Sequence, residues 1–142
     1  MKASEKLINH IKQAEGYRAK AYRCPAGRYT CGYGHTRGVT RLTTCTEARA
    51  EAWLREDLQP VENFVNAINN INTQGRFDAI VDFAFNLGLG NLRSSTLLKL
   101  IQSGAPDKEI CRELGKWVYA GGRVLNGLVT RREWEAERWM ER

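Results

Sequence analysis

A glutamate, a cysteine and a threonine near the start of the chain have the chemistry and spacing of a hydrolytic site. Glu15 can donate a proton, Cys24 follows nine positions later, and Thr30 comes six positions after that. An acid at a helix end that faces a hairpin with two more polar groups suits general acid catalysis. Cys24 is the unusual member, because an ordinary thiol is mostly protonated at neutral pH.

Two other kinds of chemistry at Cys24 fit the sequence less well. Zinc could use Cys24, Cys31, His35 and Cys45, but their spacing lacks the closely spaced ligand pairs of structural zinc sites. A Cys–His nucleophile could pair Cys24 with His10 or His35, but no local signature of a cysteine protease surrounds the cysteine. We therefore expect no metal and no cofactor.

The element that positions Glu15 is an amphipathic helix. Ser4 can cap its start, and Gly16 can adopt the left-handed conformation that ends it. One buried face is predicted from the apolar residues at helical spacing, which are Leu7, Ile8, Ile11 and Ala14. Glu15 would then lie at the negative end of the helix dipole, which disfavours a second negative charge.

A short hairpin is expected to position Cys24 and Thr30, with its turn at Pro25-Ala-Gly27. If the loop has three residues, Cys24 pairs with Arg28, and Cys24 and Thr30 share a face opposite to Cys31. A two-residue loop would instead bring Cys31 to the face of Cys24. The sequence leaves both registers open, and His35 is expected to anchor the hairpin through a hydrogen bond.

The rest of the chain is predicted to be helical, which gives an α+β, mostly helical class with a β lobe at about residues 17–40. Thr44 and Glu47 form a possible capping box, and Pro60 is expected to begin the next helix. The apolar segment 77–87 is expected to be central to the core, and 131–140 to form the last helix. Residues 115–127 are interpreted as a glycine-rich loop. We expect one domain over 1–142.

The charge balance predicts a polyanionic partner without identifying it. The 142 residues carry a net charge of +6, which suits nucleic acid, an anionic membrane surface or an acidic wall polymer. No basic tail or nucleic-acid motif is present, so no nucleic-acid partner is expected. Without an apolar segment of membrane length or a signal peptide, we expect a soluble protein with no stable membrane insertion, starting in the cytoplasm with four free thiols.

Several sequence blocks, in the same order along nearly the whole chain, resemble the phage-type lysozymes (endolysins, glycoside hydrolase family 24). The first blocks are Glu15-Gly-x-Arg-x-x-x-Tyr22, Cys24-Pro-x-Gly-x-x-Thr30 and Gly32-Tyr-Gly-His-Thr36. The later ones are Phe83-Ala-Phe-Asn-Leu-Gly88, Ser95-Thr-Leu-Leu98, Trp117 and the segment 121–133.

The resemblance implies a lysozyme-like fold with an active-site cleft between its lobes. It implies hydrolysis of the β-1,4 bond between N-acetylmuramic acid and N-acetylglucosamine in bacterial peptidoglycan. Glu15 would be the general acid and Thr30 would position the attacking water, with inversion of configuration. Cys24 falls where many members carry aspartate. Substrate contacts would come from Thr36, Phe85, Asn86, Ser95 or Thr96, and Asn126.

The resemblance also implies a monomeric phage lysis enzyme that waits in the host cytoplasm until a separate membrane pore, a holin, lets it reach the periplasmic wall. Three roles for Cys24 stay open: a thiolate that assists the water or the sugar cation, a nucleophile, or a spectator beside Glu15 and Thr30. The competing class is a non-catalytic module on the same fold that binds cell wall or nucleic acid.

Overall fold

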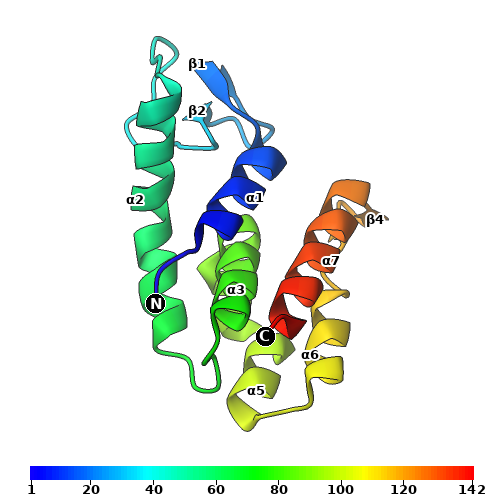
Figure 1. Ribbon diagram of the computed structural model, residues 1–142. Coiled ribbons are helices and arrows are strands. Elements are labelled where there is room, and N and C mark those ends of the chain that lie inside the picture. Colours follow the sequence, from blue (N-terminus) through cyan, green and yellow to red (C-terminus); the bar gives the residue numbers. More distant parts are fainter. The chain divides into compact units, whose positions relative to one another are not determined.

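The computed structural model describes residues 1–142 and confirms the mostly helical α+β class. The elements in chain order are α1 (Glu5–Glu15), β1 (Arg18–Arg23), β2 (Tyr29–Gly32), α2 (Glu47–Asn66), α3 (Gln74–Leu87), α4 (Leu89–Ser94), α5 (Thr96–Ser103), α6 (Asp107–Leu114), β3 (Tyr119–Ala120), β4 (Arg123–Val124) and α7 (Asn126–Met140) (Figure 1). None of these helices combines the length and the apolar composition of a membrane-spanning segment.

The chain divides into two compact units. Residues Ile8–Gln59 form one of them, called here the hairpin unit because it contains β1 and β2. Met1–Leu7 and Pro60–Arg142 form the other, called here the helical unit.

The first helix ends as predicted, directly after Glu15. Ser4 caps its start, since the Ser4 hydroxyl accepts a hydrogen bond from the Leu7 N–H at 3.1 Å. Gly16 has a φ of 74° and donates its N–H to the Lys12 carbonyl at 2.9 Å. This left-handed glycine turns the chain directly into β1.

The hairpin has the three-residue loop, so the first of the two registers is confirmed. Tyr22 pairs with Thr30 and Arg23 with Tyr29, and the Cys24 N–H donates to the Arg28 carbonyl at 2.9 Å. Alternation along the strands then places Cys24 and Thr30 on one face. Cys31 lies on the other face.

Two predictions at α2 were wrong. The Thr46 hydroxyl, not Thr44, caps the helix by accepting from the Arg49 N–H at 3.1 Å, because Thr44 is occupied in a β-bridge with Lys20. Pro60 does not begin a new helix but lies inside α2. A proline removes one backbone hydrogen bond, and the turns on either side hold the helix together. The boundary between the two units falls at this residue.

In the helical unit, α3 is the buried centre, as its apolar sequence predicts. It packs against α7, and the two backbones approach closely at Gly75. A Cβ atom at Gly75 would lie 2.3 Å from the Arg138 carbonyl oxygen, so this crossing requires glycine. Figure 1 shows α6 alongside α7 in the same unit.

Buried ion pairs join α3 to α7. Asp78 is fully buried and accepts hydrogen bonds from Ser4, Gln74 and Arg138. Arg131 binds Asp82, with 3.0 Å between Nη2 and Oδ1. Within α7, the Glu135 carboxylate accepts a hydrogen bond from Arg132 Nε at 2.8 Å. Burial raises the pKa of Glu135 well above its ordinary value.

The glycine-rich segment before α7 is not the simple loop expected from the sequence. It forms the small β3–β4 hairpin, with Gly121 and Gly122 in its turn at φ values of 58° and 78°. Adjacent residues with positive φ allow a two-residue turn that matches strand twist. The last helix starts at Asn126, five residues before the expected start at Arg131.

Candidate active site

The Glu15 carboxyl lies against the backbone of Gly34. An ideal Cβ atom at Gly34 would be 3.4 Å from Glu15 Oε2, and the glycine has a φ of 84°. Gly34 follows β2 in a tight turn closed by the Cys31–His35 bridge. The sequence showed this turn only as part of a motif. It did not predict that Gly34, which has no side chain, would lie against the Glu15 carboxyl.

Cys24 and Thr30 meet across the hairpin. Hydrogen bonds to the Cys24 sulfur, first from the Arg28 backbone and then from Ala26 and the Thr30 side chain, lower its pKa below the ordinary 9.0, while partial desolvation opposes this shift. At a given pH, a larger fraction of Cys24 is therefore thiolate than of an ordinary cysteine.

The other cysteines lie in different environments. All four are free thiols in this structure. Cys31 and Cys45 have sulfur atoms 3.4 Å apart, and burial followed by the bond to Cys31 raises the pKa of Cys45 to about 11. Burial also raises the pKa of Cys111. The pKa of Cys24 is thus lowered, whereas the pKa values of Cys45 and Cys111 are raised. A lower thiol pKa favours reactivity.

The Thr30 side chain is fixed within the hairpin. It is buried, with 4% of its surface exposed, and its Oγ1 lies 3.3 Å from the Arg28 carbonyl oxygen, to which it donates. A hydroxyl fixed in this way can orient a neighbouring molecule without first losing rotational freedom.

His35 anchors the turn after β2 to α2, as predicted. Its Nδ1 lies 2.8 Å from Asp57 Oδ2, and its ring stacks on Trp53 with 4.5 Å between centroids. His35 is therefore engaged with α2, while Cys24 faces Thr30. The four possible zinc ligands do not form a group that could hold a metal ion: Cys31 adjoins Cys45, but His35 binds Asp57.

The residues predicted to contact substrate are distributed over both units. Thr36 is exposed in the hairpin unit. In the helical unit, Phe85 is half-buried on α3, and Asn86 accepts a hydrogen bond from Arg132 Nη2 at 2.7 Å. Thr96 and Asn126 are exposed first residues of α5 and α7, and Ser95 caps α5 through the Leu98 N–H.

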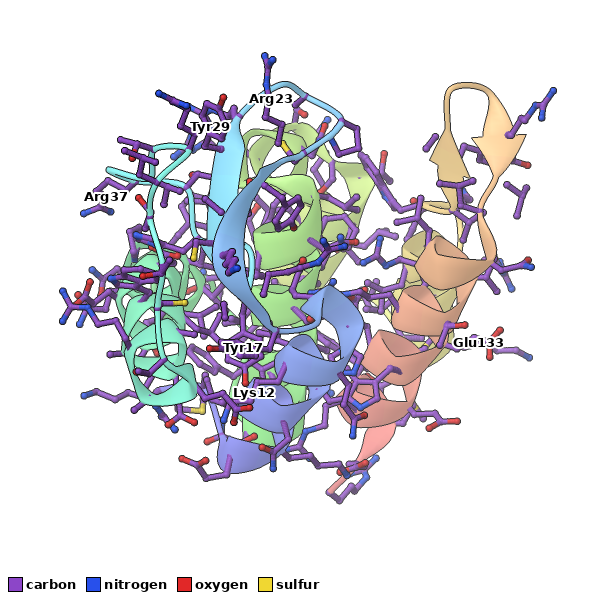
Figure 2. The ribbon with its side chains drawn as sticks, turned by 90° about the horizontal axis from the view of Figure 1, so that it is seen from above. Lys12, Tyr17, Arg23, Tyr29, Arg37 and Glu133 are labelled. Carbon is purple, nitrogen blue, oxygen red and sulfur yellow. The ribbon has the colours of Figure 1, made fainter.

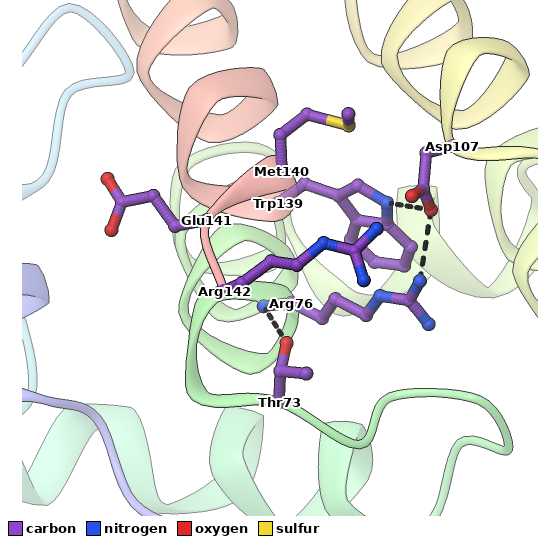
Figure 3. Close-up of a pocket in the computed structure, with 7 residues that line it drawn as sticks. All are labelled: Thr73, Arg76, Asp107, Trp139, Met140, Glu141 and Arg142. Atoms are coloured by element: carbon purple, nitrogen blue, oxygen red, sulfur yellow. Dashed lines mark hydrogen bonds and ion pairs between the residues drawn. The ribbon is translucent and has the colours of Figure 1, made fainter.

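A separate cavity of about 170 Å³ lies in the helical unit near the end of α7 (Figure 3). Asp107 accepts hydrogen bonds from Arg76 and from the Trp139 indole, each at 3.0 Å, and Thr73 caps α3 through the Arg76 N–H. These polar groups satisfy one another within the protein. The cavity therefore has the features of a packing site rather than a site for chemistry.

The phage lysozyme family model matches residues 12–135, and the chain belongs to this family. The endolysin of Bacillus phage B103 is 45% identical over 139 residues, covering 95% of this chain but 52% of the relative. The endolysin of Acyrthosiphon pisum secondary endosymbiont phage 1 is 41% identical, with 95% of each chain covered. The chain thus spans about half the length of the first relative and nearly all of the second.

Solved structures agree with this assignment. The muramidase domain of SpmX from Asticaccaulis excentricus has a TM-score of 0.92 and 33% identity, with 99% of each chain covered. The active form of the P1 phage endolysin Lyz has a TM-score of 0.87 and 28% identity, covering 99% of this chain and 85% of that one. The lysozyme-like fold that the sequence motifs implied is confirmed.

Proposed function

We propose that this chain is a muramidase of the endolysin type, which hydrolyses the β-1,4 bond between N-acetylmuramic acid and N-acetylglucosamine in peptidoglycan. The observation that carries the proposal is that Cys24 and Thr30 share one face of the hairpin in the same unit as Glu15, in a chain of the phage lysozyme family. The whole of 1–142 would act as one catalytic domain.

Glu15 is the proton donor in this mechanism. It transfers a proton to the glycosidic oxygen as the bond from that oxygen to the anomeric carbon breaks. A water molecule attacks the anomeric carbon from the opposite face and gives up a proton, so the configuration inverts. NMR of the first products tests this step, since retention would require a covalent intermediate.

Cys24 takes the proton of the attacking water as a thiolate, and Thr30 orients that water. The lowered pKa of Cys24 supports this role, because a base must be deprotonated at the working pH. The buried Thr30 hydroxyl adjoins the same sulfur, so one hairpin carries both groups. In this proposal the acid, Glu15, lies on α1, and the base, Cys24, lies on the β1–β2 hairpin.

Sugar contacts are proposed for Thr36, Phe85, Asn86, Thr96 and Asn126. Exposed hydroxyl and amide groups suit hydrogen bonds to sugar hydroxyl and N-acetyl groups, and the half-buried Phe85 ring suits an apolar sugar face. The protein would act as a monomer on the bacterial wall, after a holin pore lets it leave the host cytoplasm, without a nucleic-acid partner.

A non-catalytic wall-binding module on the same fold is the competing function. A turbidity assay with permeabilised Gram-negative cells separates the two. The muramidase proposal expects clearing by the unmodified protein and loss of clearing by Glu15→Gln. Equal behaviour of the two proteins without any clearing would favour the binding module.

A further inference from the structure

The net charge of the protein is concentrated in one segment. Residues 16–46 contain no aspartate or glutamate and six basic side chains: Arg18, Lys20, Arg23, Arg28, Arg37 and Arg41. The rest of the chain has 16 basic and 16 acidic residues, so the excess of +6 is located in this segment alone. We call these six residues the basic lobe.

The side chains of the basic lobe are exposed and form no ion pair. Two carboxylates of α2 in the same unit are engaged with residues outside the lobe: Glu51 binds Lys12 and Arg55, and Asp57 binds His35. Figure 2 shows Arg23 and Arg37 extending outward from the hairpin unit. The lobe therefore offers positive charge that the protein does not neutralise.

Aromatic rings hold two of these guanidinium groups in place. Arg18 lies over the Tyr22 ring at 4.5 Å and Arg23 over the Tyr29 ring at 5.7 Å. Cation–π contacts of this kind restrict the arginine while leaving its N–H donors available to a ligand. An arginine so oriented matches the planar geometry of a carboxylate.

We propose that the basic lobe binds the carboxylates of the stem peptides carried by the glycan, so that the enzyme selects peptide-bearing glycan over an uncharged one. This inference rests on the proposed function, because Glu15, Cys24 and Thr30 lie in the same unit as the lobe. The carboxylates recur along the polymer at each peptide, and several exposed cations can engage them together.

An anionic membrane fits the lobe less well. Interfacial membrane binding requires an apolar face as well as positive charge. Leu42, 77% exposed, is the one large hydrophobic side chain exposed in segment 16–46. A polymer that presents carboxylates without an apolar layer matches this composition better.

The test measures binding of catalytically inactive Glu15→Gln protein to insoluble peptidoglycan sacculi by co-sedimentation. The lobe variant adds Lys20→Gln, Arg37→Gln and Arg41→Gln. The control variant adds Lys99→Gln, Lys108→Gln and Arg112→Gln, which are exposed, form no ion pair and remove the same charge from the helical unit. We expect the lobe variant to bind roughly tenfold more weakly at low salt and the control to bind nearly normally.

A second arm leaves the protein unchanged and alters the polymer. Sacculi whose peptide carboxyls have been converted to amides should bind the Glu15→Gln protein as weakly as native sacculi bind the lobe variant. Thermal melting checks that each variant is folded. If the lobe variant does not fold, the binding of Glu15→Gln protein to amidated sacculi still tests the inference.

Equal losses in the lobe and control variants, or unchanged binding to amidated sacculi, would overturn the inference. Preferential binding to vesicles of anionic phospholipid would overturn it as well and assign the lobe to a membrane. These results are independent of the proposed activity, which fails only if the unmodified protein releases no fragments from native sacculi.

Discussion

Cys24 and Thr30 lie on the same face of the β1–β2 hairpin. The backbone of Arg28, then that of Ala26 and the Thr30 side chain lower the pKa of the Cys24 thiol, so the hairpin turn is an environment that stabilises a thiolate. Cys24 stands where many relatives are expected to carry aspartate. The hairpin thus compensates in part for the weaker acidity of a thiol.

Substitutions of Cys24 should rank by their ability to carry negative charge. We expect Cys24→Asp to retain substantial activity and Cys24→Ala to lose about 100-fold or more, because the base is gone. Cys24→Ser should resemble Ala, since a hydroxyl does not ionise near neutral pH. The rate of fragment release from sacculi measures each. An Ala variant as active as the parent would show that the thiol is a spectator.

The pH dependence should follow the ionisation of Cys24. Because its pKa is lowered, activity should rise with pH along a limb centred below 9.0. Thr30→Val removes a side chain that helps to lower the pKa of Cys24, so the limb should move to higher pH. Cys24→Asp should move it to about pH 4, the ordinary range of aspartate. A limb that stays in place in Cys24→Asp would exclude Cys24 as the titrating group.

Gly34→Ala should impair catalysis through the position of Glu15. A methyl group there would contact the Glu15 carboxylate, and a displaced acid can cost about 100-fold in rate. Gly38→Ala is the matched control, because Gly38 also has a positive φ, 71°, but no atom within 4 Å of a Cβ atom. Similar kcat values for the two variants would mean that the contact is unimportant.

The α3–α7 crossing gives a prediction of stability. Gly75→Ala should destabilise the protein by about 1–3 kcal/mol, because the new methyl group overlaps the Arg138 carbonyl. Gly90→Ala, in α4 with open space around it, should be neutral or stabilising by up to about 1 kcal/mol. Urea unfolding of both variants measures the difference. Equal midpoints would contradict the close approach of the two helices.

Local patterns in the sequence predicted the parts of the fold that local interactions decide. Ser4, Gly16 and the apolar stripe between them were sufficient to place the end of α1 at Glu15. Likewise, α3 ends at Leu87, where the apolar segment 77–87 ends. The hairpin register needed the structure, because both loop lengths satisfied the turn residues Pro25–Gly27.

Other features depended on contacts between distant residues. Thr44 has a good capping sequence but pairs with Lys20 instead, and the helix continues through Pro60 despite the lost hydrogen bond. No sequence pattern indicated that Gly34 would support Glu15 or that hydrogen bonds would lower the pKa of Cys24. The catalytic roles of Glu15, Cys24 and Thr30 and the five sugar contacts stay predictions.

The central claim is that Glu15 protonates a muramic acid glycoside, and analysis of the products tests it most directly. Sacculi digested with the unmodified protein should yield fragments with new reducing ends on N-acetylmuramic acid, identified by mass spectrometry after borohydride reduction. Glu15→Gln should yield almost none. New ends on N-acetylglucosamine, or equal yields from both proteins, would contradict the account.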